Sequence, residues 1–190
     1  MPRRKLFLCI LAFAFWPSVC WSALSYPDQY DWQFQKAAKM WLPGVDYRLL
    51  KAQCYQESLL NPKAVSPVGA KGLCQFMDFT WGEVSDALKF PPEATAFAPK
   101  LSITAAGYYM ARMRGVWTSP RPETDRHSLA LASYNAGAGN LIKAQKACGG
   151  PSLFSEIIVC LPDITGHYAK ETQTYVRRIW TYFTQMILGY

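Results

Sequence analysis

A glutamate that precedes a loop rich in glycine and proline is the feature of this sequence best suited to chemistry. Glu57 lies shortly before the segment 61–72, in which two prolines and two glycines flank Ser66. Cleaving a glycosidic bond requires a carboxylic acid whose pKa is raised by apolar surroundings, so that it can protonate the leaving oxygen near neutral pH. Apolar side chains near Glu57 in the sequence are Tyr55, Leu59, Leu60, Phe76 and Met77. Glu57 is therefore a candidate general acid, although a lone glutamate at a helix end is more often a solvated charge.

The residues after Glu57 follow an ordered pattern that continues in two later segments. The first part reads Glu57-Ser58, Asn61-Pro62, Ala64, Ser66, Gly69-Ala70, Gly72-Leu73, Gln75 and Met77. The later parts are Ala132-Ser133-Tyr134-Asn135-Ala136-Gly137, and Glu171-Thr172 with Tyr175-Val176. In this order the motifs strongly resemble those of the soluble lytic transglycosylases. The resemblance covers about 46–178.

The resemblance implies a mainly α, lysozyme-like single domain with a substrate cleft for the glycan strands of peptidoglycan. The family's catalytic glutamate maps onto Glu57. It would protonate the bond between N-acetylmuramic acid and N-acetylglucosamine, then act as base on the muramic C6 hydroxyl, which closes onto C1 as a 1,6-anhydro end. Because this nucleophile belongs to the substrate, one carboxylate suffices where a hydrolase usually needs two. The implied reaction needs no cofactor.

Six further residues match family positions expected to bind substrate: Ser66, Gln75, Tyr134, Asn135, Glu171 and Tyr175. By resemblance, Ser66 and Gln75 would hydrogen-bond the sugars or hold the catalytic loop. A tyrosine hydroxyl in this set could reach the muramic acetamide or Glu57, and Glu171 would be a structural or substrate-orienting acid. The simpler alternatives are a turn serine, a satisfied polar residue and buried aromatic side chains.

Two other functions remain open at this level. A second carboxylate opposite Glu57 would make the protein a hydrolytic lysozyme, and the nearby options are Asp78, Glu83 and Asp86. Asp78 is better interpreted as the N-cap of a helix that begins near Phe79. A catalytically silent wall-binding or assembly subunit is the third possibility, and the intact set of motif residues argues against it.

The elements that must position these residues are helices. From Asp31 onward apolar residues recur at helical spacing, and runs of β-branched residues are too short for a convincing strand. Asp46 is expected to be the N-cap of a helix that carries Glu57 at its end and stops before Asn61-Pro62. Other helices are expected over 31–42, 79–88, 101–116 and about 166–186, with two short ones flanking Gly137 and Gly139.

The N-terminal residues are typical of a targeting segment. Three basic residues at positions 3–5 precede an apolar run, and no charged residue occurs between Leu6 and Asp28. Residues 1–23 are interpreted as a signal peptide or, because Leu6 to Leu24 is close to the ~20 residues of a bilayer span, as an N-terminal membrane anchor. The remainder, 24–190, is expected to be the catalytic domain of an exported protein of the periplasm or cell envelope.

Four cysteines outside the targeting segment form an even set suited to an oxidising compartment. Cys148 and Cys160 flank a Gly149-Gly150-Pro151 turn and are the first choice for a disulfide. Cys54 and Cys74 form either a second bridge or two small buried apolar residues.

Charge and histidine content bear on partners. The formal charge of +7 falls to +4 when the three basic residues at positions 3–5 are left out. Such a spread of charge suits an anionic wall polymer or membrane surface, whereas nucleic acid would require denser clustering. His127 and His167 are far apart and are expected at the surface, so no metal site is predicted. By resemblance alone, the expected partners are peptidoglycan strands and a secretion or conjugation complex, with membrane contact only through the N-terminal segment.

Overall fold

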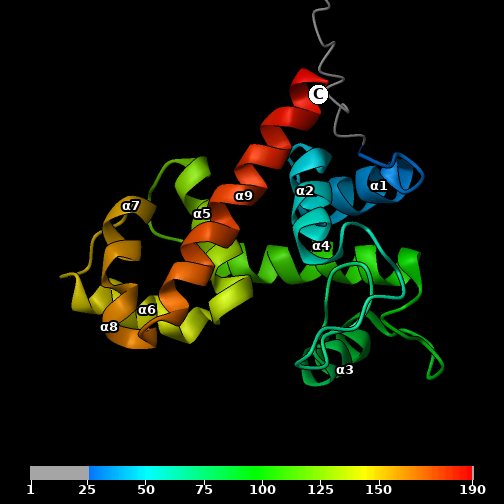
Figure 1. Ribbon diagram of the computed structural model, residues 1–190, viewed down its shortest axis with the longest axis horizontal. Coiled ribbons are helices and arrows are strands. Elements are labelled where there is room, and N and C mark those ends of the chain that lie inside the picture. The colour runs from blue at the N-terminus through cyan, green and yellow to red at the C-terminus, as the bar shows by residue number, and fades with distance from the viewer. Residues whose placement is uncertain (1–25, 190) are drawn as a thin grey trace, which may run out of the picture.

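The computed structural model describes residues 26–189, and this part of the chain is built from helices (Figure 1). The predicted signal peptide or anchor lies outside the described residues. The helices are α1 (Asp31–Trp41), α2 (Tyr47–Ser58), α3 (Asp78–Leu88), α4 (Pro99–Val116), α5 (Glu123–Ala136), α6 (Ala138–Ala147), α7 (Phe154–Ile157), α8 (Leu161–Thr165) and α9 (Tyr168–Leu188), with a 3-10 turn at Ile158–Cys160. None of the described helices has the length and apolar character required to cross a membrane. The mainly α prediction is confirmed.

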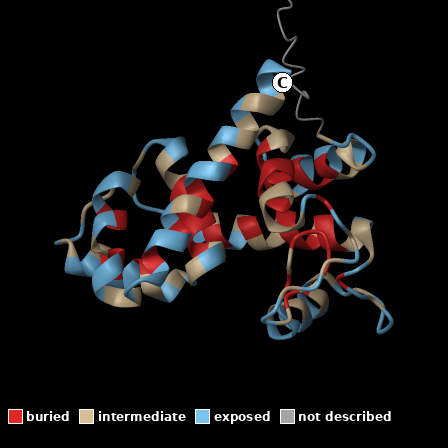
Figure 2. Ribbon diagram, viewed as in Figure 1, coloured by how far each residue is buried: buried red, intermediate tan, exposed pale blue. Residues whose placement is uncertain are grey.

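Helix α4 lies at the centre of the packing, in contact with α1, α3 and α5 (Figure 1). Helix α2 packs between α1 and α9, and α9 also covers α5. The core runs along these contacts, as the red ribbon segments of Figure 2 show. Its largest fully buried side chains include Phe34, Leu50, Ile103, Leu129 and Trp117. The molecule therefore has two lobes, one containing α1 to α3 and the other α6 to α8, joined by α4 and α9.

Helix α2 delivers Glu57 to the junction of the lobes. Asp46 caps its start, because the Asp46 side chain accepts a hydrogen bond of 2.9 Å from the Arg48 backbone N–H. The helix ends at Ser58, and its C-cap Leu59 has a left-handed φ of 55°. Leu60 is also left-handed, with φ 60°. The chain therefore leaves the helix sharply, and Glu57 remains in its last turn.

The loop between α2 and α3 is ordered by its own backbone. Lys71 and Phe76 exchange N–H to carbonyl hydrogen bonds of 2.9 and 3.0 Å, and Ser66 N–H donates to the Ala70 carbonyl at 2.9 Å. Gly72 has φ +74°, and a Cβ at this position would lie 1.9 Å from the Ala96 carbonyl oxygen. Only glycine combines this conformation with so close a backbone approach.

Several element boundaries differ from the predictions. Asp78 is the first residue of α3 and not its N-cap, which is Met77; its carboxylate instead binds the Lys71 Nζ at 2.6 Å. Gly137 separates α5 from α6, whereas Gly139 lies inside α6. Helix α4 begins at Pro99, two residues earlier than expected, because proline is well tolerated in the first helical turn. The short helices α7 and α8 were not predicted, since segments of this length carry little periodic signal.

Both cysteine pairs form disulfides. Cys148 and Cys160 are bonded across the second lobe, with their Cα atoms 5.8 Å apart. Cys54 and Cys74 are also bonded, with Cα atoms 4.5 Å apart, which resolves the alternative that the sequence left open. The second bridge joins α2 directly to the loop that follows it.

Candidate active site

Glu57 lies in a setting that favours its protonated form. The residue is partly buried, and burial raises the pKa of its carboxyl to about 7. The Tyr175 hydroxyl, on α9, donates a hydrogen bond of 2.6 Å to Glu57 Oε1 and opposes this rise, while the negative charge of Glu171 adds to it. A carboxyl with this pKa can give up and recover a proton near neutral pH.

Two tyrosines, the buried Tyr175 on α9 and the partly buried Tyr134 on α5, approach Glu57 from different helices. Burial and the negative charge of Glu57 raise the pKa of both Tyr134 and Tyr175, so both hydroxyls remain protonated donors. Tyr175 donates to Glu57, but the Tyr134 hydroxyl donates to the Cys74 carbonyl at 2.8 Å. Tyr134 thus ties α5 to the loop after α2, and in this structure its hydroxyl is not bonded to Glu57.

Ser66 and Gln75, which were predicted either to bind sugars or to hold the loop, make hydrogen bonds within the loop. Ser66 Oγ accepts a hydrogen bond from the Ala70 N–H at 3.0 Å. Gln75 has φ 52°, and its Nε2 donates to the Gly72 carbonyl at 2.9 Å and to the Ala64 carbonyl at 3.3 Å. These bonds fix the backbone of the loop, so both side chains act here on the loop itself.

Ser58 adds a contact that the sequence reasoning did not assign. Its hydroxyl donates to the Leu73 carbonyl at 2.7 Å and accepts from the Asn61 N–H at 3.1 Å. Ser58 therefore joins the end of α2 to the loop, beside the disulfide of Cys54 and Cys74. The sequence signal that could have indicated this role is the position of Ser58 immediately after Glu57 in the first motif.

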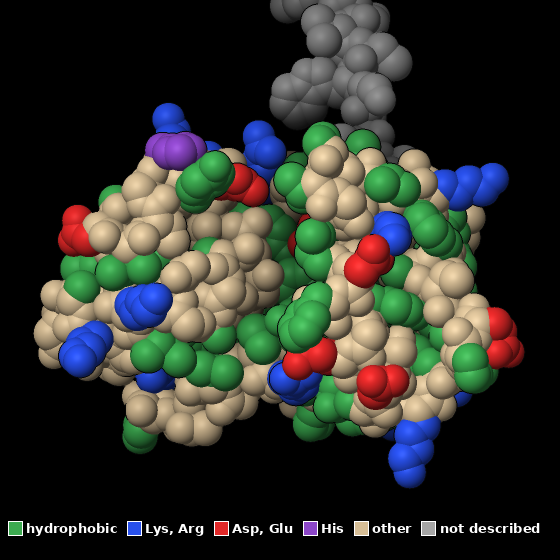
Figure 3. All heavy atoms as spheres, turned by 90° about the horizontal axis from the view of Figure 1, so that it is seen from below, with side chains coloured by type: hydrophobic (Ala, Val, Ile, Leu, Met, Phe, Trp, Pro, Cys, Tyr) green, Lys and Arg blue, Asp and Glu red, His purple; other side chains and the backbone are tan. Residues whose placement is uncertain are grey.

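Asn135 and Glu171 lie together on the other side of the site. Asn135 Oδ1 accepts a hydrogen bond of 2.7 Å from the Thr172 hydroxyl, which links α5 to α9. Both residues line a hollow of about 400 Å³ whose other lining residues include Asn140, Tyr168 and Thr172. Figure 3 shows the surface hollowed between the two lobes. Thr172 is a member of this polar set that the sequence reasoning did not single out.

The acids considered as a second catalytic carboxylate are placed differently. Asp78 has 76% of its side chain exposed and is paired with Lys71. Glu83 and Asp86 are exposed residues of α3. Among the described residues, the acidic charge that acts on Glu57 is that of Glu171.

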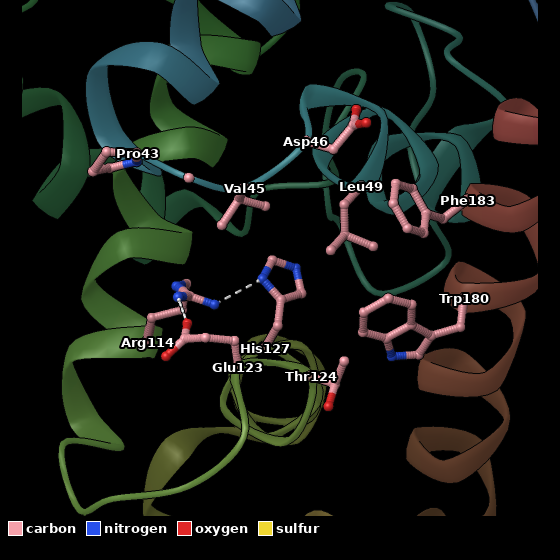
Figure 4. Close-up of a pocket in the computed structure, with 11 residues that line it drawn as sticks. Pro43, Val45, Asp46, Leu49, Arg114, Glu123, Thr124, His127, Trp180 and Phe183 are labelled. Atoms are coloured by element: carbon pink, nitrogen blue, oxygen red, sulfur yellow. Dashed lines mark hydrogen bonds and ion pairs between the residues drawn. The ribbon is translucent and has the colours of Figure 1, made fainter.

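His127 was predicted to be a surface residue, and this is wrong. It is only 2% exposed, because the face of α5 that carries it packs toward α4 and α9. Arg114 Nη1 donates to its Nδ1 at 3.2 Å, and burial lowers its pKa to about 3. His127 lines a cavity of about 430 Å³ between the start of α2 and the helices α5 and α9, with Trp180 and Phe183 on one wall (Figure 4). His167 is exposed, as predicted.

Comparison with known proteins identifies the family. The model of the Transglycosylase SLT domain matches residues 33–152, and the chain belongs to this family. Membrane-bound lytic murein transglycosylase F of Thiobacillus denitrificans is 34% identical over 142 residues, which are 72% of this chain and 28% of that protein. The corresponding protein of Erwinia tasmaniensis is 33% identical over 150 residues, which are 76% of this chain and 28% of that protein.

Solved structures agree with this assignment. An inactive mutant of the lytic transglycosylase Slt from Pseudomonas aeruginosa matches with a TM-score of 0.67 and 27% identity, covering 83% of this chain and 24% of that one. The 70 kDa soluble lytic transglycosylase from Escherichia coli has the same fold, with a TM-score of 0.68 and 23% identity over 84% of this chain and 24% of that one. The chain thus spans about a quarter of the length of these relatives, and the predicted lysozyme-like fold is confirmed.

Proposed function

We propose that the protein is a peptidoglycan lytic transglycosylase that cleaves the β-1,4 bond between N-acetylmuramic acid and N-acetylglucosamine. The observation that carries this proposal is the Glu57 carboxyl, whose pKa of about 7 suits both halves of an acid–base cycle at neutral pH. Membership of the SLT family and relatives named lytic murein transglycosylases support the choice of substrate.

Glu57 would act first as acid and then as base. The protonated carboxyl donates its proton to the glycosidic oxygen as the bond between this oxygen and C1 breaks. The resulting carboxylate then accepts the proton of the muramic C6 hydroxyl, whose oxygen bonds to C1 and closes the 1,6-anhydro ring. This step returns Glu57 to its protonated form and consumes no water. Tyr175, through its bond of 2.6 Å to Oε1, would hold the carboxyl in place through both steps.

The test is mass spectrometry of the muropeptides released from purified peptidoglycan by the protein and by its Glu57→Gln variant. Glutamine keeps the volume of the side chain but cannot titrate, so we expect anhydromuramic ends from the unaltered protein and loss of cleavage in a folded variant. Glu93→Gln is the matched control, since it removes an exposed glutamate of the connection between α3 and α4 and should leave the activity unchanged. Substantial cleavage by Glu57→Gln would refute the proposal, and reducing ends would favour a hydrolytic lysozyme.

We also propose that the protein acts in the periplasm or cell envelope and opens the wall locally beside a secretion or conjugation apparatus. Two disulfides support an oxidising compartment, and the relatives' names place them at a membrane. The proposed apparatus rests on the resemblance to the family alone. Deleting the gene should lower transfer or secretion without slowing growth; unchanged transfer would contradict this setting.

A further inference from the structure

The outward face of α1 is an amphipathic surface with no acidic residue. Its exposed residues follow helical spacing: Trp32, Gln35, Lys36, Lys39 and Met40. Trp32 is 55% exposed and Met40 56%, although the opposite face of the helix is buried in the core. Trp32 and Met40 lie about one helical turn on either side of Lys36, so apolar and cationic side chains alternate along this face.

The start of α4 extends this surface and creates a hollow in it. A cavity of about 210 Å³ lies between the two helices, with Trp32, Lys36, Met40, Phe90, Lys100 and Leu101 among its lining residues. No carboxylate lines it. Lys36, Lys39 and Lys100 make no ion pair within residues 26–189. A cationic rim around an apolar floor matches the chemistry of an anionic amphiphile.

The path of the chain points to a membrane as the source of that amphiphile. The Tyr26 hydroxyl donates to the Gln185 side chain, and its ring packs against Tyr55 and Tyr182. Tyr26, which is packed in this way, follows Leu24, the end of the uncharged stretch, with only Ser25 between them in the sequence. If that stretch remains in a bilayer as an anchor, this end of the protein must lie at the bilayer surface.

The same end of the molecule carries α1. Figure 1 shows the start of the described chain close to α1 and the end of α9, with α3 below α1 on the same side of the molecule.

We propose that the outward face of α1 and the hollow beside Lys100 form a docking surface for a bilayer containing anionic phospholipid. Lys36, Lys39 and Lys100 contact headgroup phosphates, and Trp32 lies at the interfacial depth that tryptophan prefers. Each lysine near an anionic surface strengthens binding by about fivefold. This contact goes beyond the proposed function and does not require catalysis.

A lysine footprint on the full chain tests the position of the contact. The protein is treated with an acetylating reagent on vesicles of phosphatidylglycerol and phosphatidylcholine, on vesicles of phosphatidylcholine alone, and without lipid. We expect protection of Lys36, Lys39 and Lys100 on the anionic vesicles only. The exposed lysines 143, 146 and 170, in the other lobe and at the start of α9, should react equally in all three samples. Equal protection of both sets, or none at Lys36, Lys39 and Lys100, would overturn the proposal.

Matched triple variants test the strength of the contact. Lys36→Gln/Lys39→Gln/Lys100→Gln should weaken binding to the anionic vesicles by about a hundredfold, whereas Lys143→Gln/Lys146→Gln/Lys170→Gln carries the same net charge and should change it little. Binding to neutral vesicles reports the contribution of the apolar N-terminal stretch and should be the same for all three proteins. Cleavage of purified peptidoglycan, measured without lipid, should be unchanged. A similar loss in both variants would show attraction by net charge alone and refute a defined surface.

Discussion

At the scale of single residues, the hydroxyl of Tyr175 lowers the proton affinity of Glu57. Its hydrogen bond stabilises the carboxylate and lowers the pKa of Glu57, against the larger effect of burial. The proposed mechanism needs both protonation states of Glu57, so this bond affects the pH range in which the proposed reaction can proceed. It also brings together residues that are 118 positions apart in the sequence.

Replacing Tyr175 with phenylalanine should raise the pKa of Glu57 above its value of about 7. The acid form would then persist to higher pH, and we expect the alkaline limb of kcat/KM to move upward while kcat falls by roughly tenfold. The measurement is the pH profile of cleavage. Tyr182→Phe, on the same helix, removes a hydroxyl that does not touch Glu57 and should leave the profile unchanged. A Tyr175→Phe profile that coincides with that of the unaltered protein would refute this role.

Glu57 should also make stability depend on pH. Its pKa is raised from 4.5 to about 7 on folding, so the folded state binds a proton that the unfolded state has lost between these values. The stabilising contribution is complete below about pH 4.5 and is lost as pH rises through about 7, which amounts to roughly 3 kcal/mol. Denaturant unfolding at several pH values should therefore show Glu57→Gln gaining stability over the unaltered protein as pH increases. A constant difference from pH 5 to 8 would contradict the shifted pKa.

At the scale of elements, the disulfide of Cys54 and Cys74 holds the loop against the helix that carries Glu57. The Cys148 and Cys160 bridge has a similar span in sequence, 12 residues against 20, but lies in the other lobe. The chain-entropy estimate for closing either loop is about 3 kcal/mol. The two bridges should therefore stabilise the fold by similar amounts. Only the bridge of Cys54 and Cys74 lies beside the candidate site, since it joins α2 to the loop after it.

We expect Cys54→Ala/Cys74→Ala and Cys148→Ala/Cys160→Ala to lose comparable free energy of unfolding, about 2–4 kcal/mol each. Only the first should also lower kcat under conditions where both variants are folded, because the loop is released beside Glu57. Unfolding by denaturant and cleavage of peptidoglycan measure the two effects. Equal loss of kcat in both variants would show that the first bridge serves stability alone.

At the scale of the whole molecule, the packing of α5 against α4 and α9 buries His127 in neutral form. Its pKa is lowered to about 3 from 6.5, so its stabilising contribution is present above about pH 6.5 and is lost as pH falls toward 3. This dependence opposes that of Glu57 between about pH 4.5 and 6.5. The unaltered protein should consequently show a flatter stability curve in this range than either group alone would give.

The His127 contribution is best isolated in the Glu57→Gln background. There we expect the free energy of unfolding to fall by roughly 2 kcal/mol from pH 6.5 to pH 5, and His127→Gln in the same background to remove this fall. Denaturant unfolding at each pH provides the measurement. The window stays above pH 5, so that protonation of the paired carboxylates Asp46 and Glu123, whose pKa values are lowered, does not contribute. A fall that persists without His127 would assign it to another group.

Much of this architecture was accessible from sequence because its causes are local. Helical periodicity, the cap at Asp46 and the Asn61-Pro62 stop depend on residues a few positions apart, and they located the helix of Glu57 correctly. The order of the motifs likewise predicted the family to which the chain belongs. The predicted start of α3 was wrong because the Asp78 carboxylate pairs with Lys71 instead of capping the helix, and this contact between loop and helix has no local sequence signal.

The sequence by itself thus determined the helical class, the family and the choice of Glu57 as the candidate acid. Tertiary structure alone decided that Tyr175 bonds Glu57, that Tyr134 bonds the loop, and that His127 is buried. The pKa of about 7 at Glu57 belongs to the second group, since it follows from how closely separate helices enclose one carboxyl. Helical periodicity and capping depend on residues a few positions apart in the sequence. Burial, and hydrogen bonds between distant residues, depend on how all the helices pack.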